Sequence, residues 1–380
     1  MAEAVGDRDR RLLIVLPSWV GDAVMATPAL RLIRDTLPGW YIGAICRPGI
    51  DQVLAGLDSL DEVHIAPTTG VLGPKRVAAQ LRPRRYAAAL LLTNSFSTAL
   101  ATRVAGIPMR LGYERDGRGL LLTHRLTAPK REGGGWAIVP AVAYYHHAAR
   151  ALLDVLADRQ VNATAPIEPL PARARLELVA TDADIIKAAD VLTKAGIDPE
   201  TKLAVLNPGG NNTAKRWPPD RFGQLADWLL EAHGLTSVIN ASPAEAEIAA
   251  AVRAASRCGP PNLADHGGSL ASLKGVLARS SLMVTNDTGP RHMAAALSVP
   301  VVSLFGPTDH RWTTIPTPAG EQLVLADPDL PEGQTANDDP QRSRVDRITL
   351  DRVQQAVDLV LNTNHAPADG GGEGGLAPGR

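Results

Sequence analysis

A strand, a short loop, a helix and a second strand follow one another between Leu282 and Pro307, in the sequence LMVTNDTGPRHMAAALSVPVVSLFGP. The first apolar run stops at Asn286, and the second covers residues 299–305. This order predicts a βαβ unit. The loop after its first strand is therefore expected at the carboxyl edge of an open α/β sheet, where such folds bind ligands.

The loop Asn286-Asp287-Thr288-Gly289 precedes the predicted helix. Its backbone N–H groups and the helix dipole favour an anion such as phosphate. His292 is expected one turn into the helix, beside the loop. The alternative is that Asp287 or Thr288 only caps the helix, as Asp and Thr often do. The loop by itself leaves both interpretations open.

Length and composition place the chain among globular proteins of two domains, because 380 residues are many for one hydrophobic core. The formal net charge of −1 gives no bulk electrostatic reason to expect nucleic acid or an anionic membrane as a partner. Cys46 and Cys258 are too few for a disulfide scaffold or a zinc site, and they fit a reducing cytosol. No apolar run approaches the roughly 20 residues that cross a bilayer.

Short apolar runs alternate with amphipathic stretches along the chain, which predicts an α/β fold of parallel sheets with helices on both faces. Strands are predicted at residues 12–16, 41–46, 63–66, 87–92, 203–207, 237–240, 282–286 and 299–305. Helices are predicted at 22–36, 49–57, 73–81, 95–105, 136–156, 182–195, 219–233, 244–256, 270–278 and 350–361. Residues 316–347 are expected to be irregular.

Two Rossmann-like halves that face each other across a cleft are the expected organisation. Residues 161–173 are rich in Pro and Ala without clear periodicity, and they are the candidate linker. The expected parts are a flexible N-terminus at 1–10, an N-terminal domain at 11–172, a C-terminal domain at 173–348, a helix at 349–362 and a disordered Gly-rich tail at 363–380.

The first predicted strand leads into Pro17-Ser18-Trp19-Val20-Gly21-Asp22. Gly21 permits a close backbone approach, and Asp22 lies at the expected start of a helix. Asp22 is either a structural residue of that helix start or a carboxylate that accepts a proton at the edge of the sheet. The helix N-terminus is expected to lower the pKa of Asp22, which weakens it as a base.

A second polar loop, NPGGNNTAKRWP at 207–218, also follows a predicted strand and precedes a helix. Its Gly, Asn and Thr residues offer hydrogen-bond donors and Lys215 adds a positive charge, a composition that favours phosphate. A surface turn with incidental basic residues is the alternative. The loop lacks the GxxxxGK[ST] spacing, no GxGxxG motif follows a predicted strand, and no metal-ligand spacing is found.

Four motifs occur together in order: PSWVGD at 17–22, KRWP at 215–218, NDTGPRHMAAAL at 286–297 and FGPTD at 305–309. As a set they resemble the bacterial heptosyltransferases that build the inner core of lipopolysaccharide, which form family 9 of the glycosyltransferases. The PSWVGD start, and Asn94-Ser95-Phe96-Ser97 after a predicted strand, are closer to the second of these heptosyltransferases than to the first.

The resemblance implies a GT-B fold and an inverting, metal-independent transfer of heptose from ADP-heptose to a sugar hydroxyl of the lipopolysaccharide core, without a cofactor. It implies a lipid-linked oligosaccharide acceptor at the inner membrane. A monomer is expected, cytoplasmic or peripheral on the inner membrane face, with no nucleic-acid partner. Two alternatives remain: a family 9 transferase that uses another nucleotide sugar for a different surface glycan, and a sugar-nucleotide epimerase or binding module of the same fold.

The resemblance also implies roles for individual residues. Asp22 is the expected general base, and Lys215 the expected partner of the donor phosphates. The amides of Thr288 and Gly289 are expected to face the diphosphate, and Asp287 to bind heptose hydroxyls. The full donor set is Gly210, Asn211, Lys215, Glu245, Gly268, Asp287, Thr288, Gly289 and His292. The acceptor-side set is Ser18, Trp19, Gly21, Asn94 and Ser95.

Overall fold

The structure, a computed structural model, describes residues 10–66, 72–131, 134–317, 319–329, 334, 336–339 and 341–363. The expected flexible N-terminus and Gly-rich tail lie outside the described residues, apart from Arg10 and Thr363. Within the described ranges, no helix combines the length and apolarity that crossing a membrane requires.

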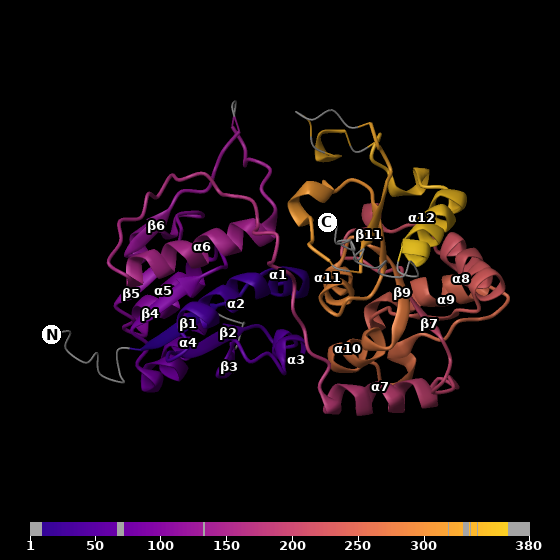
Figure 1. The fold of residues 1–380 in the computed structure, drawn as a ribbon, viewed down its shortest axis with the longest axis horizontal. Coiled ribbons are helices and arrows are strands. Elements are labelled where there is room, and N and C mark those ends of the chain that lie inside the picture. The colour runs from indigo at the N-terminus through magenta and orange to yellow at the C-terminus, as the bar shows by residue number, and fades with distance from the viewer. Residues whose placement is uncertain are drawn as a thin grey trace, which may run out of the picture.

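Two separate parallel sheets organise the chain (Figure 1). The first has the order β3–β2–β1–β4–β5–β6 and consists of β1 (Arg11–Val15), β2 (Tyr41–Cys46), β3 (Glu62–Ile65), β4 (Ala88–Leu91), β5 (Met109–Tyr113) and β6 (His124–Leu126). The second has the order β11–β10–β9–β7–β8 and consists of β7 (Leu203–Asn207), β8 (Thr236–Ile239), β9 (Ser280–Asn286), β10 (Val301–Phe305) and β11 (Glu321–Leu325). The predicted α/β architecture of two halves is confirmed.

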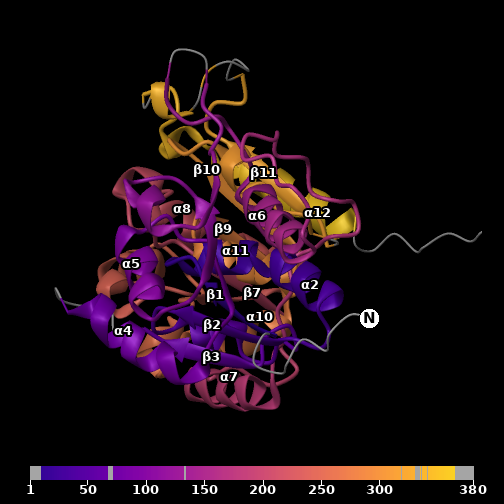
Figure 2. The ribbon, with the colours of Figure 1, turned by 90° about the vertical axis from the view of Figure 1, so that its left-hand side faces the viewer.

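Helices cover both faces of each sheet. Those of the first half are α1 (Val20–Met25), α2 (Thr27–Thr36), α3 (Ile50–Leu54), α4 (Gly73–Leu81), α5 (Phe96–Val104) and α6 (Ala141–Leu156). Those of the second half are α7 (Asp182–Lys194), α8 (Pro219–His233), α9 (Ala246–Ala254), α10 (Leu270–Ala278), α11 (Gly289–Ala296) and α12 (Leu350–Thr363). Figure 2 shows α4 and α5 on one side of the first sheet, with α2 and α6 on the other.

The side chains of β1 alternate between two hydrophobic cores, as the period of a strand requires. Leu12 and Ile14 enter a core with α2 and α6, whereas Leu13 and Val15 enter a second core with α4 and α5. The first of these cores also contains residues of β7, α10 and α11. Buried apolar contact is therefore continuous from one half to the other, which limits how far the halves can separate.

The helix predicted at 22–36 is two helices that meet at Ala26. Pro28 has no N–H group to donate to the carbonyl of Val24, and the hydroxyl of Thr27 donates to that carbonyl instead, at 2.7 Å. The break leaves α1 as a separate six-residue helix at the carboxyl end of β1.

The helix predicted at 136–156 begins only at Ala141, so that prediction was wrong over its first turn. Trp136 forms an isolated antiparallel bridge with Lys130, and Pro140 holds the N-cap in an extended conformation. A residue before proline is driven away from the helical region, which accounts for the late start.

Three strands were not predicted, namely β5, β6 and the edge strand β11. The segment expected to be irregular at 316–347 contains β11, whose Glu321 pairs with buried Arg291 at 2.7 Å. Charged residues within these short strands hid the apolar pattern. Arg291, two residues after the NDTG loop, therefore points to the sheet and not to the loop.

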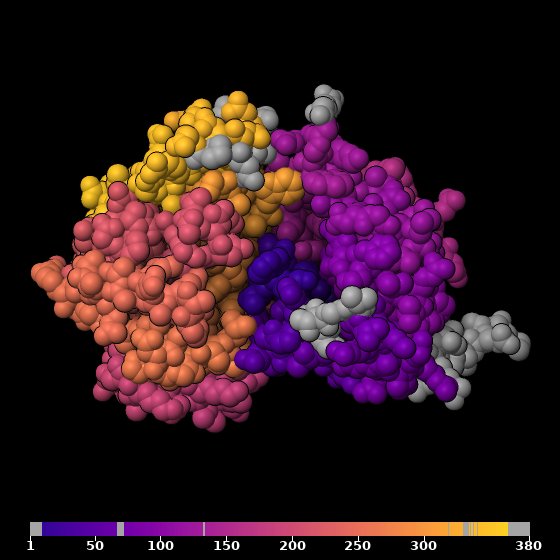
Figure 3. Space-filling model, turned by 180° about the vertical axis from the view of Figure 1, so that it is seen from behind, coloured from indigo at the N-terminus to yellow at the C-terminus, as the bar shows by residue number. Residues whose placement is uncertain are grey.

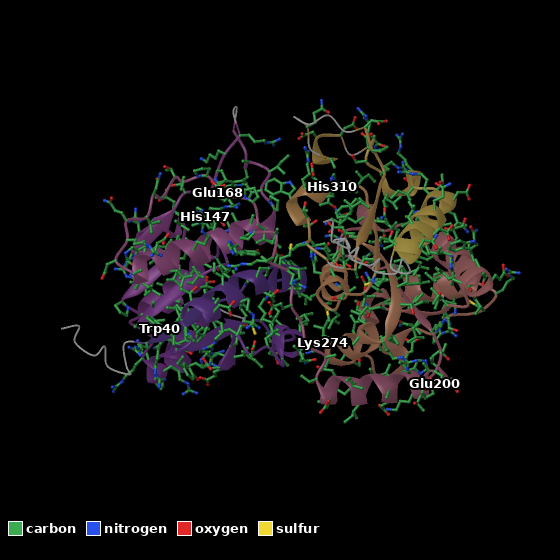
Figure 4. The ribbon with its side chains drawn as sticks, viewed as in Figure 1. Trp40, His147, Glu168, Glu200, Lys274 and His310 are labelled. Atoms are coloured by element: carbon green, nitrogen blue, oxygen red, sulfur yellow. The ribbon has the colours of Figure 1, made fainter. Side chains whose placement is uncertain are left out.

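Contacts between the two halves include those of α6 with the 3-10 helix His310–Thr313, of α1 with α11 and of α3 with α10. Lys274 of α10 lies at this junction in Figure 4 and is fully buried. Its ammonium donates to the carbonyls of Gln52, Val53 and Ala55 at the end of α3, at 2.8–3.3 Å, and pairs with Asp184 of α7 at 2.9 Å. One buried charge thus joins the halves.

Candidate active site

A cavity of about 590 Å³ lies between the halves, at the carboxyl ends of β1, β7 and β9. Figure 3 shows the surface hollowed between the two lobes, with the indigo N-terminal segment at the base. The cavity wall contains most of the predicted site residues: Trp19, Gly21, Asp22, Gly210, Asn211, Lys215, Glu245, Gly268, Asp287, Thr288, Gly289 and His292. Asn94 lines a neighbouring cavity, and Ser18 and Ser95 line neither.

Asp22 is the third residue of α1, and its carboxylate accepts a hydrogen bond from the Tyr145 hydroxyl of α6 at 2.9 Å. Burial raises the pKa of Asp22, and the nearby Asp287 carboxylate also raises it. The Tyr145 hydrogen bond lowers this pKa, but by less. The backbone N–H at the start of α1 does lower this pKa, as predicted, but the loss of hydration dominates, so the expected lower pKa of Asp22 was wrong as a net result.

Lys215 and Asp287 form an ion pair across two loops of the second half, with Nζ 3.1 Å from Oδ2. Burial by itself would raise the pKa of Asp287, but the positive charges of Lys215 and Arg291 outweigh it and hold this pKa below its usual value. Asp287 is consequently an anion that faces Asp22 of the other half.

The start of α11 is open at the cavity wall. Thr288 has the backbone conformation of an N-cap, but among the described residues no side chain caps this helix. The Thr288 hydroxyl accepts from the side-chain amide of Asn207 at 2.8 Å instead. The interpretation of Asp287 or Thr288 as a simple cap was therefore wrong, and the Gly289 N–H and the helix dipole remain open to an anion.

Asn286 holds the two predicted loops together. Its side-chain carbonyl accepts from the Trp217 N–H at 3.1 Å, and its amide donates to the carbonyls of Pro208 and Gly209 at 2.8 and 3.1 Å. Sequence reasoning assigned no role to Asn286 or Asn207. A polar amide at the end of each buried strand was the available signal, because such a group must find partners.

His292 forms the wall where α11 meets α1. Burial is the main cause that lowers its pKa, to about 3, so the imidazole is neutral at neutral pH. Its Nδ1 has no partner among the described residues. A Cβ atom on Gly21 would lie 2.7 Å from His292 Cδ2 and 3.4 Å from Gly289 Cα. Only glycine at position 21 allows the two helices this approach.

Glu245 and Gly268 of the second half also line the cavity. The Glu245 carboxylate accepts from the N–H groups of Gly210 and Ser242 at 2.7 and 3.0 Å. Burial would raise the pKa of Glu245, but these hydrogen bonds outweigh it and lower the pKa. A Cβ atom on Gly268 would lie 2.7 Å from the Leu263 carbonyl oxygen, so this position requires glycine.

A second cavity of about 240 Å³ adjoins the first. Asp22, Met25 and Thr313 line both cavities. The other residues that line the second cavity include Asn94, Arg115, Trp136, Tyr144, Tyr145 and Trp312. Except for Asn94, sequence reasoning missed these residues, because they come from loops and helices that only the fold brings together.

No group of three or more His, Cys, Asp and Glu side chains in the described ranges is arranged to hold a metal ion. The positive groups at the first cavity belong to the protein itself, namely Lys215 and the N-terminus of α11. The arrangement as a whole can hold an anionic group against the second half while Asp22 accepts a proton from the first.

Known proteins share both the sequence and the fold of this chain. Residues 75–337 match Glycosyltransferase family 9 (heptosyltransferase). The chain is 28% identical over 313 residues to lipopolysaccharide heptosyltransferase 2 of Escherichia coli (strain K12), covering 80% of this chain and 84% of that protein.

Solved structures give the same fold. The structure of E. coli ADP-heptose lps heptosyltransferase II matches with a TM-score of 0.75 at 24% identity, over 94% of this chain and 100% of that one. E. coli heptosyltransferase WaaC with ADP-2-deoxy-2-fluoro heptose matches with a TM-score of 0.64 at 20% identity, over 92% and 99%. The predicted GT-B fold is confirmed, and because the family match covers most of the chain, this protein belongs to glycosyltransferase family 9 and is a glycosyltransferase.

Proposed function

We propose that this protein transfers heptose from ADP-heptose to a sugar hydroxyl of the lipopolysaccharide core, with inversion and without a metal ion. The names of its relatives support the donor and the acceptor. The arrangement that carries the proposal is the position of Asp22, which faces the Lys215–Asp287 pair across one cavity.

Asp22 is the base on the acceptor side. It takes the proton of the acceptor hydroxyl as that oxygen forms a bond to the anomeric carbon of the heptose. Its raised pKa suits a group that must bind a proton during the reaction, and Tyr145 fixes the direction of its carboxylate. One displacement on the face opposite the departing ADP inverts the anomeric centre.

The second half binds the leaving group. The bond from the anomeric carbon to the diphosphate breaks, and its electron pair leaves with ADP. Lys215 and the Gly289 N–H at the start of α11 are placed to stabilise that charge. Lys215 is paired with Asp287, so a bound donor takes over Lys215 and leaves Asp287 to bind heptose hydroxyls.

Replacing Asp22 by Asn tests this assignment. We expect Asp22→Asn to lower turnover by about 100-fold or more, because general base catalysis is lost. The Kd of ADP measured by calorimetry should stay within about threefold, since this substitution leaves Lys215 and the α11 N-terminus unchanged. Asp35→Asn, at an exposed carboxylate of α2, is the matched control. Undiminished turnover in Asp22→Asn would contradict the proposal.

A panel of nucleotide sugars separates the alternatives. Release of ADP only with ADP-heptose and an acceptor supports the proposed reaction, and the anomeric configuration of the product, read by NMR, tests inversion. Turnover with a different nucleotide sugar favours the other family 9 activity. A product formed without any acceptor indicates an epimerase, and binding without turnover indicates a nucleotide-binding module.

A lipid-linked acceptor requires the protein to work at the cytoplasmic face of the membrane, and one surface favours this. Between Glu62 and Glu114 the sequence has seven Lys and Arg residues and no Asp or Glu. Five of the basic residues are exposed on α4, on α5 and in the turn between α4 and β4: Lys75, Arg76, Arg82, Arg85 and Arg103. Leu72, three residues before Lys75, and Phe96, the first residue of α5, are 59% and 49% exposed. Positive charge next to exposed apolar side chains suits an anionic lipid surface.

Sedimentation with vesicles tests this location. The protein should bind phosphatidylglycerol vesicles at low salt and release at high salt, because exposed charges are screened. Arg82→Glu combined with Arg85→Glu should abolish binding, whereas Arg173→Glu with Arg175→Glu, at exposed arginines outside this surface, should not. Equal binding by both double variants would contradict the membrane surface.

A further inference from the structure

We infer that the second cavity is the acceptor subsite and that Arg115 selects there a sugar that carries an anionic group, a carboxylate or a phosphate. This inference rests on the proposed function, because it takes Asp22 as the base. Asp22 lines both cavities, together with Met25 and Thr313. A sugar in the second cavity can therefore present a hydroxyl to Asp22 while the donor occupies the first.

Arg115 supplies the positive charge of this subsite. Of the described residues that line the second cavity, Arg115 is the only basic one and Asp22 the only acidic one. The guanidinium carbon of Arg115 lies 3.8 Å from the centre of the Trp136 ring. This stacking holds the planar group in place without using its hydrogen-bond donors.

Arg115 has no anionic partner in the described part of the chain. None of the ion pairs between described residues includes it, and its Nε is buried without a hydrogen-bond partner. The neighbour to which it is hydrogen-bonded is the phenol of Tyr144, whose pKa burial raises, so the phenol stays neutral. A guanidinium that lines a cavity and has no carboxylate partner is complemented best by an anionic ligand.

Aromatic walls complete the subsite. Trp136 and Tyr144 come from the first half, whereas Trp312 comes from the short 3-10 helix His310–Thr313 of the second half. Cavities lined by aromatic faces with a few placed polar groups are typical small-molecule sites. Because Trp312 lies on the far side of the domain boundary, the subsite needs both halves, as the donor cavity does.

Three forms of one truncated lipopolysaccharide core oligosaccharide test the inference: unmodified, with its carboxylates converted to methyl amides, and with its phosphates removed by phosphatase. For Arg115→Gln we expect the KM of the unmodified acceptor to rise by about 10- to 100-fold, the loss typical of a charged hydrogen bond. The KM of ADP-heptose should change by less than about threefold, because Arg115 does not line the first cavity.

The modified acceptors identify the anion. The wild-type protein should lose affinity for whichever form lacks the recognised group, and Arg115→Gln should cause no further loss with that form. Arg115→Lys keeps the positive charge but loses the planar guanidinium with its paired N–H donors. Its KM for the unmodified acceptor should therefore lie between those of the wild type and Arg115→Gln. Lys130→Gln is the matched control, because Lys130 lies 5.7 Å from the same Trp136 ring but does not line the cavity.

Two results would overturn the inference: an equal rise of KM in Arg115→Gln for charged and neutral acceptors, or a rise in the KM of ADP-heptose alone. A wild-type protein that transfers no heptose would overturn the proposed function instead. In that event, saturation-transfer NMR can measure binding of the three oligosaccharides to the wild-type and Arg115→Gln proteins. This comparison still decides whether Arg115 binds the anion.

Discussion

Asp22 combines two opposing influences within one residue. Burial makes its charged form costly, while the Tyr145 hydroxyl stabilises that form through a hydrogen bond. Tyr145 itself keeps its proton, because burial raises its pKa well above the usual value. The hydroxyl is therefore a fixed donor, and the balance between burial and this hydrogen bond sets the pH at which Asp22 becomes a base.

Tyr145→Phe should shift the pH dependence of turnover. The base works in its deprotonated form, so activity is present above the pKa of Asp22 and is lost as the pH falls through it. Removing the hydrogen bond raises this pKa further, and the acidic limb of the kcat profile should move to higher pH. Turnover between pH 4 and 9 measures this; a limb that stays in place, or moves to lower pH, would contradict the role of Tyr145.

At the level of whole elements, the position of α1 depends on α11. The two helices meet at Gly21 and Gly289. Gly21 faces His292 and Gly289, and a Cβ atom on Gly289 would lie 3.1 Å from the Val20 Cβ atom. This close contact sets the distance between Asp22 on α1 and the loop that begins α11. Because α1 is separated from α2 at Ala26, the contact with α11 matters more for its position.

Gly21→Ala should lower kcat/KM by about 100-fold, because a displacement of about 1 Å between reacting groups has an effect of that size. The added methyl group would lie 2.7 Å from His292 Cδ2 and would push the helices apart. Gly39→Ala is the control, since its methyl group would meet only the Arg10 side chain, at 3.9 Å. Steady-state kinetics of both variants measure this effect. Equal kcat/KM in Gly21→Ala and Gly39→Ala would show that the contact between α1 and α11 does not position Asp22.

At the scale of the whole molecule, Lys274 joins the two halves away from the cavity. The carbonyls at the end of α3 and the carboxylate of Asp184 all contact this one ammonium group, and Asp184 also accepts hydrogen bonds from Thr181. Burial raises the pKa of Asp184, but hydrogen bonds from Lys274 and Thr181 outweigh it and lower the pKa. The carboxylate is therefore charged, and it needs Lys274 to remain buried.

Lys274→Met should lower the free energy of unfolding by about 3 kcal/mol, because one partner of a buried ion pair is left without the other. Lys187→Met on the exposed face of α7 is the control and should change it by less than about 0.5 kcal/mol. Urea denaturation followed by tryptophan fluorescence measures both. A loss in Lys274→Met no larger than in the control would show that this contact contributes little to stability.

The sequence predicted the central strands and the first cavity, but not the second cavity. Strands such as β1, β7 and β9 are buried on both faces and read as continuous apolar runs, which a single sequence reveals. The loops after them could be predicted as a site because parallel strands end at one edge. Edge strand β11 was hidden, because Glu321 looks like a surface residue until Arg291 is placed beside it.

The roles of Tyr145 and Arg115 could not have been predicted from the sequence pattern. Tyr145 reaches Asp22 across 123 positions of the sequence, and nothing in its own helix distinguishes it from Tyr144. Arg115 lies in a loop among other arginines, and only its stacking on Trp136 separates it from them. Both depend on tertiary packing, which local periodicity does not encode.

Among the described residues, the two cavities share only Asp22, Met25 and Thr313, which allows donor and acceptor specificity to change separately. Substitutions around Trp136 can alter which acceptor is used while the nucleotide site keeps its shape, and the reverse holds for the loops of the second half. Relatives with different acceptors can therefore arise mainly by divergence of the first half, which supplies the described lining of the second cavity apart from Trp312 and Thr313. Exchanging the first half between two such relatives, up to the candidate linker at 161–173, is a rational way to build transferases with a new acceptor and an unchanged donor.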